Sequence, residues 1–168
     1  ISFERYVLAA YFEDIISAAN IRFAKMTNSR FELLRKEDVG DKRKGQGLDL
    51  EVYDNYTGKS RDVKTLSGGE SFKASLAMAL GLSDVVQRYS GGIQLDTIFI
   101  DEGFGTLDPE SLDIAIETLI DLQDNGRVVG IISHVQELKD RIEVKLEVTS
   151  TNQGSKAEFK IWYGIVNK

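Results

Sequence analysis

The chain has 168 residues, which is the length of one domain with at most a small appendage. With 42% apolar and 29% charged residues it has a globular composition, which excludes a mainly disordered chain. The 21 basic and 27 acidic residues give a net charge of −6, which excludes a surface dominated by contacts to nucleic-acid phosphates. Cysteine is absent, which excludes disulfides and thiolate sites and fits a reducing cytoplasm. We expect a soluble protein, since no apolar run approaches the ~20 residues that span a bilayer.

The first 28 residues predict one long amphipathic helix. This stretch has no Gly or Pro, and its apolar residues recur at nearly helical spacing: Phe3, Val7, Ala10, Ile15, Ala18, Phe23 and Met26. From residue 30 to 64 the pattern changes to short alternating runs, clearest in Leu48–Val52, which are separated by glycines. We expect an antiparallel β layer there.

The second half predicts an α/β fold with parallel strands. A helix is expected from about Gly68 to Gln87, followed by a buried strand at 97–100, a helix from Pro109 to about Gln123 and a second buried strand at 128–132. An unbroken apolar strand, a helix and another apolar strand indicate a right-handed parallel crossover. Alternation in 142–148 and 159–163 predicts a terminal hairpin with one face toward water.

Ser67 and Glu70 open the helix after residue 67 and admit two interpretations. Ser followed three residues later by Glu is a capping box, which explains a helix start and nothing more. Gly68 and Gly69 between them are unfavourable in a helix, however, and they let a ligand approach the backbone N–H groups. A bare helix N-terminus beside a serine hydroxyl suits a phosphate.

Asp101 and Glu102 end the first apolar strand. A chain that leaves a sheet must become polar, so acidic residues can stand there without a function. At the carboxyl end of a parallel strand, however, one carboxylate can hold Mg²⁺ while its neighbour orients an attacking water. Further on, Asp108 as cap and Pro109 at the first helical position explain the next helix start, but not the glycines on both sides of Phe104.

His134 is the only histidine, so no site with several histidine ligands is possible. A lone histidine is more often structural than catalytic. It follows the strand that lies one crossover after Asp101, and we therefore expect both on the same rim of the sheet. The segment Gly58-Lys59-Ser60 resembles the end of a P-loop, but Tyr53 stands where the first glycine belongs, so we expect a hairpin turn. No other segment supplies a phosphate-binding P-loop.

Four segments in this order resemble the signature motif, Walker B, D-loop and H-loop of ABC-type ATPases. They are Leu66-Ser67-Gly68-Gly69-Glu70, Ile98-Phe99-Ile100-Asp101-Glu102, Thr106-Leu107-Asp108 and Ser133-His134. The wording of residues 101–108 is similar to the SbcC family of DNA-repair ATPases, whereas transporter cassettes usually place proline where Gly103 stands. The resemblance extends over the whole chain and implies the C-terminal lobe of a split ATPase head: 1–28 as the root of a coiled coil, 30–64 as the antiparallel layer and 65–168 as the motif-bearing core.

The resemblance also implies a role for each motif residue. Ser67, Gly68 and Gly69 would contact the γ-phosphate of ATP held by the opposite head, and Asp108 would lie where the two heads meet. Asp101 would support Mg²⁺, Glu102 would polarise the hydrolytic water and His134 would contact the γ-phosphate. The P-loop would come from an N-terminal lobe, so the chain alone is expected to be an inactive ATPase.

The same resemblance implies partners and a location. They are a second head, an SbcD-type nuclease docked near the opening helix, and DNA, in the cytoplasm with the nucleoid. Core packing explains the opening helix equally well, and the basic cluster Lys42-Arg43-Lys44 is more often solvated than bound to DNA. Rivals are another ABC-type motor, chromosomal or transporting, and a non-catalytic coiled-coil scaffold. The family's sheet order further predicts that Val128–Ile132 forms an open apolar edge that makes the isolated lobe self-associate.

Overall fold

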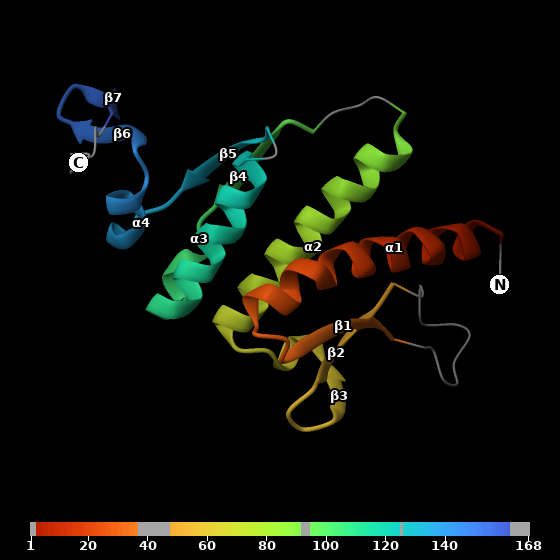
Figure 1. Cartoon of the computed structure of the whole chain (residues 1–168). Coiled ribbons are helices and arrows are strands. Elements are labelled where there is room, and N and C mark those ends of the chain that lie inside the picture. Colours follow the sequence, from red (N-terminus) through yellow and green to blue (C-terminus); the bar gives the residue numbers. More distant parts are fainter. Residues whose placement is uncertain (1–2, 37–47, 92–94, 125, 162–168) are drawn as a thin grey trace, which may run out of the picture. The chain divides into compact units, whose positions relative to one another are not determined.

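The computed structural model describes residues 3–36, 48–91, 95–124 and 126–161, and its first element is the predicted long helix (Figure 1). Helix α1 covers Phe3–Met26. It ends at a turn in which Asn28 and Ser29 adopt positive φ angles of 49° and 58°. Such angles are uncommon outside glycine, and here they reverse the chain so that the next strand returns along the helix. The chain divides into two units, residues 1–131 and residues 132–168.

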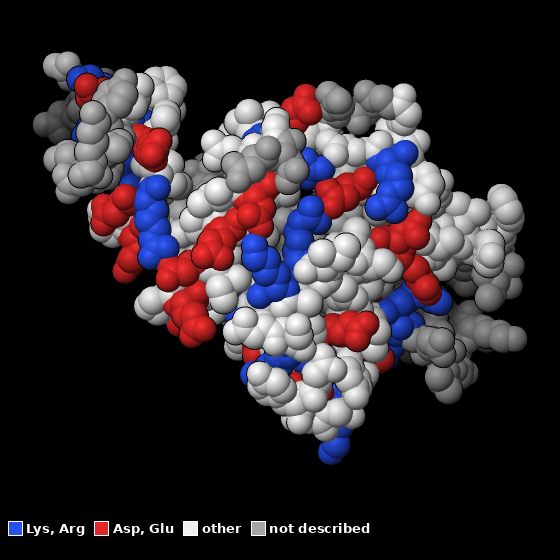
Figure 2. All heavy atoms as spheres, in the orientation of Figure 1, with Lys and Arg blue, Asp and Glu red and all other residues white. Residues whose placement is uncertain are grey.

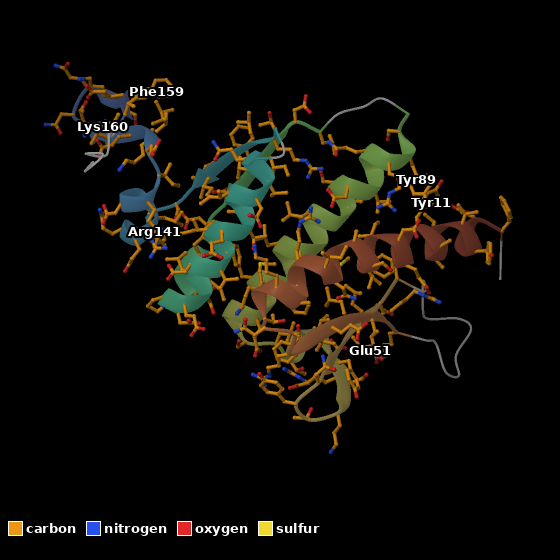
Figure 3. All side chains as sticks on the ribbon, in the orientation of Figure 1. Tyr11, Glu51, Tyr89, Arg141, Phe159 and Lys160 are labelled. Atoms are coloured by element: carbon orange, nitrogen blue, oxygen red, sulfur yellow. The ribbon has the colours of Figure 1, made fainter. Side chains whose placement is uncertain are left out.

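Helix α2, Gly68–Tyr89, packs closely against α1 in the first unit. The approach is closest at Gly81, where an added Cβ would lie 2.7 Å from the Ile15 carbonyl oxygen and 2.8 Å from the Ala19 nitrogen. Near the far end of the pair, the rings of Tyr11 and Tyr89 meet edge to face at 5.0 Å (Figure 3). The two helices therefore bury a common core, which includes Ala19, Phe23, Ala77 and Leu80.

Strands β1 (Phe31–Arg35), β2 (Leu50–Asp54) and β3 (Lys59–Asp62) form the predicted antiparallel layer. Asn20 of α1 fixes this sheet to the helix, because its side chain accepts from the Leu33 N–H at 2.8 Å and donates to the Leu33 carbonyl at 2.9 Å. Leu33 pairs with Val52, and both are fully buried. Gly58 has a φ of 66° in the turn between β2 and β3, which confirms the hairpin interpretation of Gly58-Lys59-Ser60.

Strands β4 (Thr97–Asp101) and β5 (Val128–Ile132) form the predicted pair, joined by helix α3 (Pro109–Asp124). The Val128 N–H donates to the Asp96 carbonyl at 2.6 Å where both strands begin, so the paired strands run in the same direction. Before α3, residues Phe104–Thr106 form a 3-10 turn, and Val63–Thr65 form another before α2. The expected strand–helix–strand order is confirmed.

The prediction that both of these strands are buried is wrong for the chain by itself. Phe99 is 74% exposed, and Val128 and Ile132 are also exposed. The Phe99 ring lies over Gly130 of the neighbouring strand, where an added Cβ would stand 2.5 Å from it. The strands are apolar because they belong inside a sheet, but no element among the described residues covers this apolar surface.

The second unit contains α4 (Gln136–Arg141), which the sequence analysis did not predict, and the terminal hairpin of β6 (Val144–Thr151) and β7 (Gly154–Ile161). Its register pairs Leu146 with Phe159. Both faces of the hairpin are exposed, so the prediction of a single face toward water holds only for its polar side. Trp162 and Tyr163 lie outside the described residues. No helix among the described ranges is long and apolar enough to cross a membrane.

Candidate functional site

The first turn of α2 is built by the predicted capping box. Ser67 has an extended backbone with φ −64° and ψ 166°, and its Oγ accepts from the Glu70 N–H at 3.3 Å. In return the Glu70 carboxylate accepts from the Ser67 N–H at 2.9 Å. Because the bond from Glu70 uses a lone pair of the hydroxyl oxygen, it leaves the Ser67 O–H hydrogen for another acceptor.

Gly68 and Gly69 have a packing reason that the sequence did not reveal. A Cβ on Gly69 would lie 3.1 Å from the Thr106 carbonyl oxygen, and one on Gly68 would lie 3.6 Å from the Thr106 Cβ. The loop that follows β4 therefore lies directly against the first turn of α2. Small residues at these positions allow this contact, whether or not a phosphate also approaches there.

Asp101 and Glu102 end β4 at a sharply turned backbone. Glu102 has a φ of 60°, and Gly103 follows with a φ of 99°. A positive φ is strained for a glutamate, and such strain is concentrated at functional sites. The Phe72 ring of α2 fills the place of a Cβ on Gly103 and packs edge to face on buried Phe104 at 4.9 Å. Gly103 is thus explained by its backbone angle and by this contact.

Asp108 caps α3 and is linked to α2 through Ser111. Its carboxylate accepts from the Ser111 N–H at 3.0 Å and from the Ser111 hydroxyl at 2.6 Å, which confirms the predicted helix start. Lys73 of α2 donates to the same hydroxyl at 3.0 Å. The two bonds from Ser111, with a smaller contribution from the charge of Lys73, lower the pKa of Asp108. The loop from Gly103 to Asp108 is therefore fixed to α2 at both ends.

His134 lies in the second unit, between β5 and α4. Beside it, the Ser133 Oγ accepts from the Val135 N–H at 3.1 Å. The expectation that His134 shares a rim with Asp101 stays a prediction. The basic cluster 42–44 lies outside the described residues.

Charges of both signs share the surface of the first unit. Figure 2 shows acidic side chains along α3 beside basic ones, and one such pair is Lys25 with Asp121 at 2.6 Å. A nucleic-acid backbone requires basic side chains gathered together, and this face of the described structure does not gather them. The prediction from net charge agrees with this view.

Sequence reasoning missed the residues that hold the site in place. Ser111 carried a usable signal, because Asp followed three residues later by Ser is a capping pattern. Arg30 and Arg61, which face the Glu70 carboxylate at 3.7 Å and 3.8 Å, carried none. They lie at the ends of a strand and a turn far from Glu70 in the sequence, so only the packing of the sheet on α2 reveals them.

Comparison with known proteins identifies the family of this arrangement. The family described as SbcC/RAD50-like, Walker B motif, matches residues 37–121. The SbcC component of nuclease SbcCD from Vibrio cholerae serotype O1 is 60% identical over 155 residues, which is 92% of this chain and 15% of the relative. The same component from Staphylococcus haemolyticus is 54% identical over 160 residues, 95% of this chain and 16% of the relative. The chain thus spans about a sixth of the curated relatives it matches.

Solved structures agree on the fold. A structure from work on ATP-driven dimerization and DNA-stimulated activation of SMC ATPases matches with a TM-score of 0.66 and 17% identity, covering 92% of this chain and 88% of the other. The Smc head domain of Pyrococcus furiosus bound to the C-terminal domain of ScpA matches with a TM-score of 0.63 and 15% identity, covering 94% and 37%. The chain therefore has the α/β fold of an SMC-type head lobe and belongs to the SbcC/RAD50-like family.

Proposed function

We propose that this chain supplies the signature, Walker B, D-loop and H-loop segments of an SbcC-like ATPase head, which closes on ATP together with a second head. The observation that carries the proposal is the packing of the Gly103–Asp108 loop on the first turn of α2. That loop joins the serine directed at one nucleotide to the carboxylates that act on another. Movement at one nucleotide would thus be felt at the other.

Each residue has a task that its surroundings support. Ser67 and the N–H groups of Gly68 and Gly69 would hold the γ-phosphate bound to the opposite head, since a helix N-terminus favours an anion. Glu102 would accept a proton from the attacking water, and His134 would contact the γ-phosphate. Phosphoryl transfer needs mainly positioning and charge stabilisation, so these few groups suffice once a companion lobe binds the nucleotide.

The donor set at the end of β4 fits Mg²⁺. Among the described residues, no group of three or more His, Cys, Asp or Glu side chains is placed to hold a metal ion. Mg²⁺ is usually bound by one or two carboxylates together with substrate phosphates and water, which is what Asp101 can offer. When bound, the ion would neutralise charge on the phosphates. Asp101 would orient it, and Glu102 would remain available to water.

The partners follow from the missing parts. The 168 residues contain no P-loop, so we infer an N-terminal lobe that carries it and an inactive chain without that lobe. The names of the relatives support an SbcD-type nuclease and DNA as further partners, and a location with the nucleoid in the cytoplasm. They also favour an SbcC-like head over a transporter motor.

Replacing Glu102 tests the proposal in the complete two-lobed protein. Glu102→Gln should lower ATP turnover by about 100-fold or more, because general-base catalysis contributes that much, while ATP-driven dimerisation persists. Turnover by phosphate release and dimerisation by sedimentation measure the two effects separately.

Glu110→Gln is the matched control, because Glu110 is an exposed carboxylate in the first turn of α3. It should change turnover by less than about twofold, as surface substitutions usually do. Undiminished turnover in Glu102→Gln would contradict the catalytic assignment and favour the non-catalytic scaffold.

A further inference from the structure

The carboxylate of Glu70 is enclosed by two arginines that come from the antiparallel sheet. Arg30 NH1 lies 3.7 Å from one Glu70 oxygen, and Arg61 NH2 lies 3.8 Å from the other, which also accepts from the Ser67 N–H. The Glu70 side chain is mostly buried. Both capping oxygens therefore face a guanidinium as well as belonging to the turn that presents Ser67.

Each arginine is itself held in place. Arg30 NH2 donates to Asp54 of β2 at 3.2 Å, and its guanidinium lies 4.5 Å over the Phe31 ring. The Asp54 side chain is only 4% exposed. Burial acts to raise the pKa of Asp54, but the bonds from Arg30 and from the Tyr56 N–H outweigh it and lower that pKa. Arg30 thus neutralises one buried carboxylate and reaches a second.

Arg61 reaches Glu70 from the other side. Its NH1 donates to the Thr65 carbonyl at 2.7 Å and to the Thr65 hydroxyl at 2.8 Å. These bonds fix the guanidinium two residues before Ser67 and restrict its rotation. The group of two arginines and two carboxylates carries no net charge.

This neutrality matters where an anion is to bind. A carboxylate in the first turn of α2 stands three residues from Ser67, and an unpaired negative charge there would repel a triphosphate. We propose that Arg30 and Arg61 are positioning residues, which neutralise Glu70 and hold its capping bond so that the Ser67 hydroxyl is presented to the γ-phosphate of the opposing head. This rests on the proposed function of Ser67.

The arrangement also gives the root helix a route to the site. Arg30 directly follows the turn at the end of α1, where Asn28 and Ser29 have positive φ angles. The Asn55 side chain donates to the Ser29 carbonyl at 2.9 Å, and the Asn55 N–H donates to the Arg30 carbonyl at 2.8 Å. A change at the base of α1 would therefore displace Arg30 and, through Glu70, Ser67.

The test measures ATP-driven dimerisation of the complete two-lobed protein by sedimentation, and nucleotide binding by the single head with a fluorescent ATP analogue. Arg61→Ala, which leaves the Arg30–Asp54 pair intact, should raise the ATP concentration for half-maximal dimerisation about tenfold, as an unpaired like charge predicts. Binding by the single head should not change. Arg30→Ala should act in the same direction, and Arg30→Lys should restore part of the loss.

The decisive variant adds Glu70→Gln to Arg61→Ala. The glutamine oxygen can still accept from the Ser67 N–H, but the charge is gone, so the double variant should dimerise at nearly the original ATP concentration. Failure of this rescue would overturn the proposal, because the arginine would then act by touching the phosphate or by packing alone. Arg22→Ala is the matched control: it breaks an ion pair with Asp84 that also joins α1 to α2, and it should alter thermal stability without altering the ATP dependence.

Ser67→Arg separates the two levels of the argument. If it blocks dimerisation while Arg61→Ala behaves like Arg22→Ala, the positioning role is wrong and the proposed function stands. If Ser67→Arg leaves dimerisation unchanged, the proposed function fails and the positioning role fails with it.

Discussion

The first sheet and the terminal hairpin contain the same kind of cross-strand apolar pair with opposite exposure. Leu33 and Val52 face each other across β1 and β2 and are 1% and 0% exposed. Leu146 and Phe159 face each other across β6 and β7 and are 54% and 72% exposed. Strand pairing therefore sets the register in both places, but an additional element is needed to bury the pair.

Helix α1 is that element for the first sheet. Asn20 binds both backbone groups of Leu33, and α1 in turn rests on α2 at Gly81. Within the second unit, no described element covers the apolar side of the hairpin. The free energy of unfolding of this chain should thus depend strongly on the α1–α2 contact and weakly on the hairpin.

The largest effect is expected at Gly81. In Gly81→Val the new side chain would collide with the backbone of Ile15 and Ala19, which cannot rotate away as a side chain could. The helices must separate, and we expect a loss of about 3 kcal/mol in the free energy of unfolding, measured by urea titration.

Ala79→Val supplies the control on the exposed face of the same helix. It introduces the same branched side chain and should lose only about 0.5 kcal/mol through helix propensity. Equal losses in the two variants would show that the closeness of α1 and α2 does not limit stability.

The elements were predictable from the sequence because they depend on local patterns. Spacing of apolar residues located α1, and the pair of Ser67 with Glu70 located the start of α2. Glycines gave the turn at Gly58. These signals act over a few residues, and the structure confirms them.

Burial and support were not predictable in the same way. The apolar wording of β4 and β5 records the surroundings of a complete sheet, so it predicted burial that this chain alone does not provide. The contacts of Thr106 with Gly69, and of Arg30 with Glu70, join residues about 40 positions apart. Single-sequence patterns do not encode such distances, whereas the motif wording did predict which residues to examine.

A smaller contrast between the two regions is expected in acid. The pKa of Asp54 is lowered from its ordinary value of 3.8 in the folded protein, so this carboxylate stabilises the fold above that value and the contribution is lost as pH falls through the lower folded pKa. Asp54→Asn should therefore destabilise the chain at neutral pH and converge with the original chain in acid.

Glu147 of the hairpin provides the comparison. The hydrogen bond and charge of Lys160 lower its pKa too, but its side chain is 53% exposed, so water and salt screen the pair. Glu147→Gln should leave the acid limb of stability nearly unchanged at physiological salt. Urea titrations at neutral and acidic pH measure both variants, and a larger effect at Glu147 would reverse the comparison.

The smallest effect on unfolding is expected at Phe159, which stands on β7 beside Lys160 (Figure 3). Because its ring remains largely exposed after folding, Phe159→Ser should change the free energy of unfolding by less than about 0.5 kcal/mol. Exposed apolar area of this kind favours association between copies, so the same variant should lower self-association measured by light scattering. Lys160→Ser changes the adjacent position on the polar face and removes no apolar area, so it should leave self-association intact. A clear loss of stability in Phe159→Ser would mean that the hairpin face is covered in solution, and the two sheets would then differ in their covering partner and not in whether they have one.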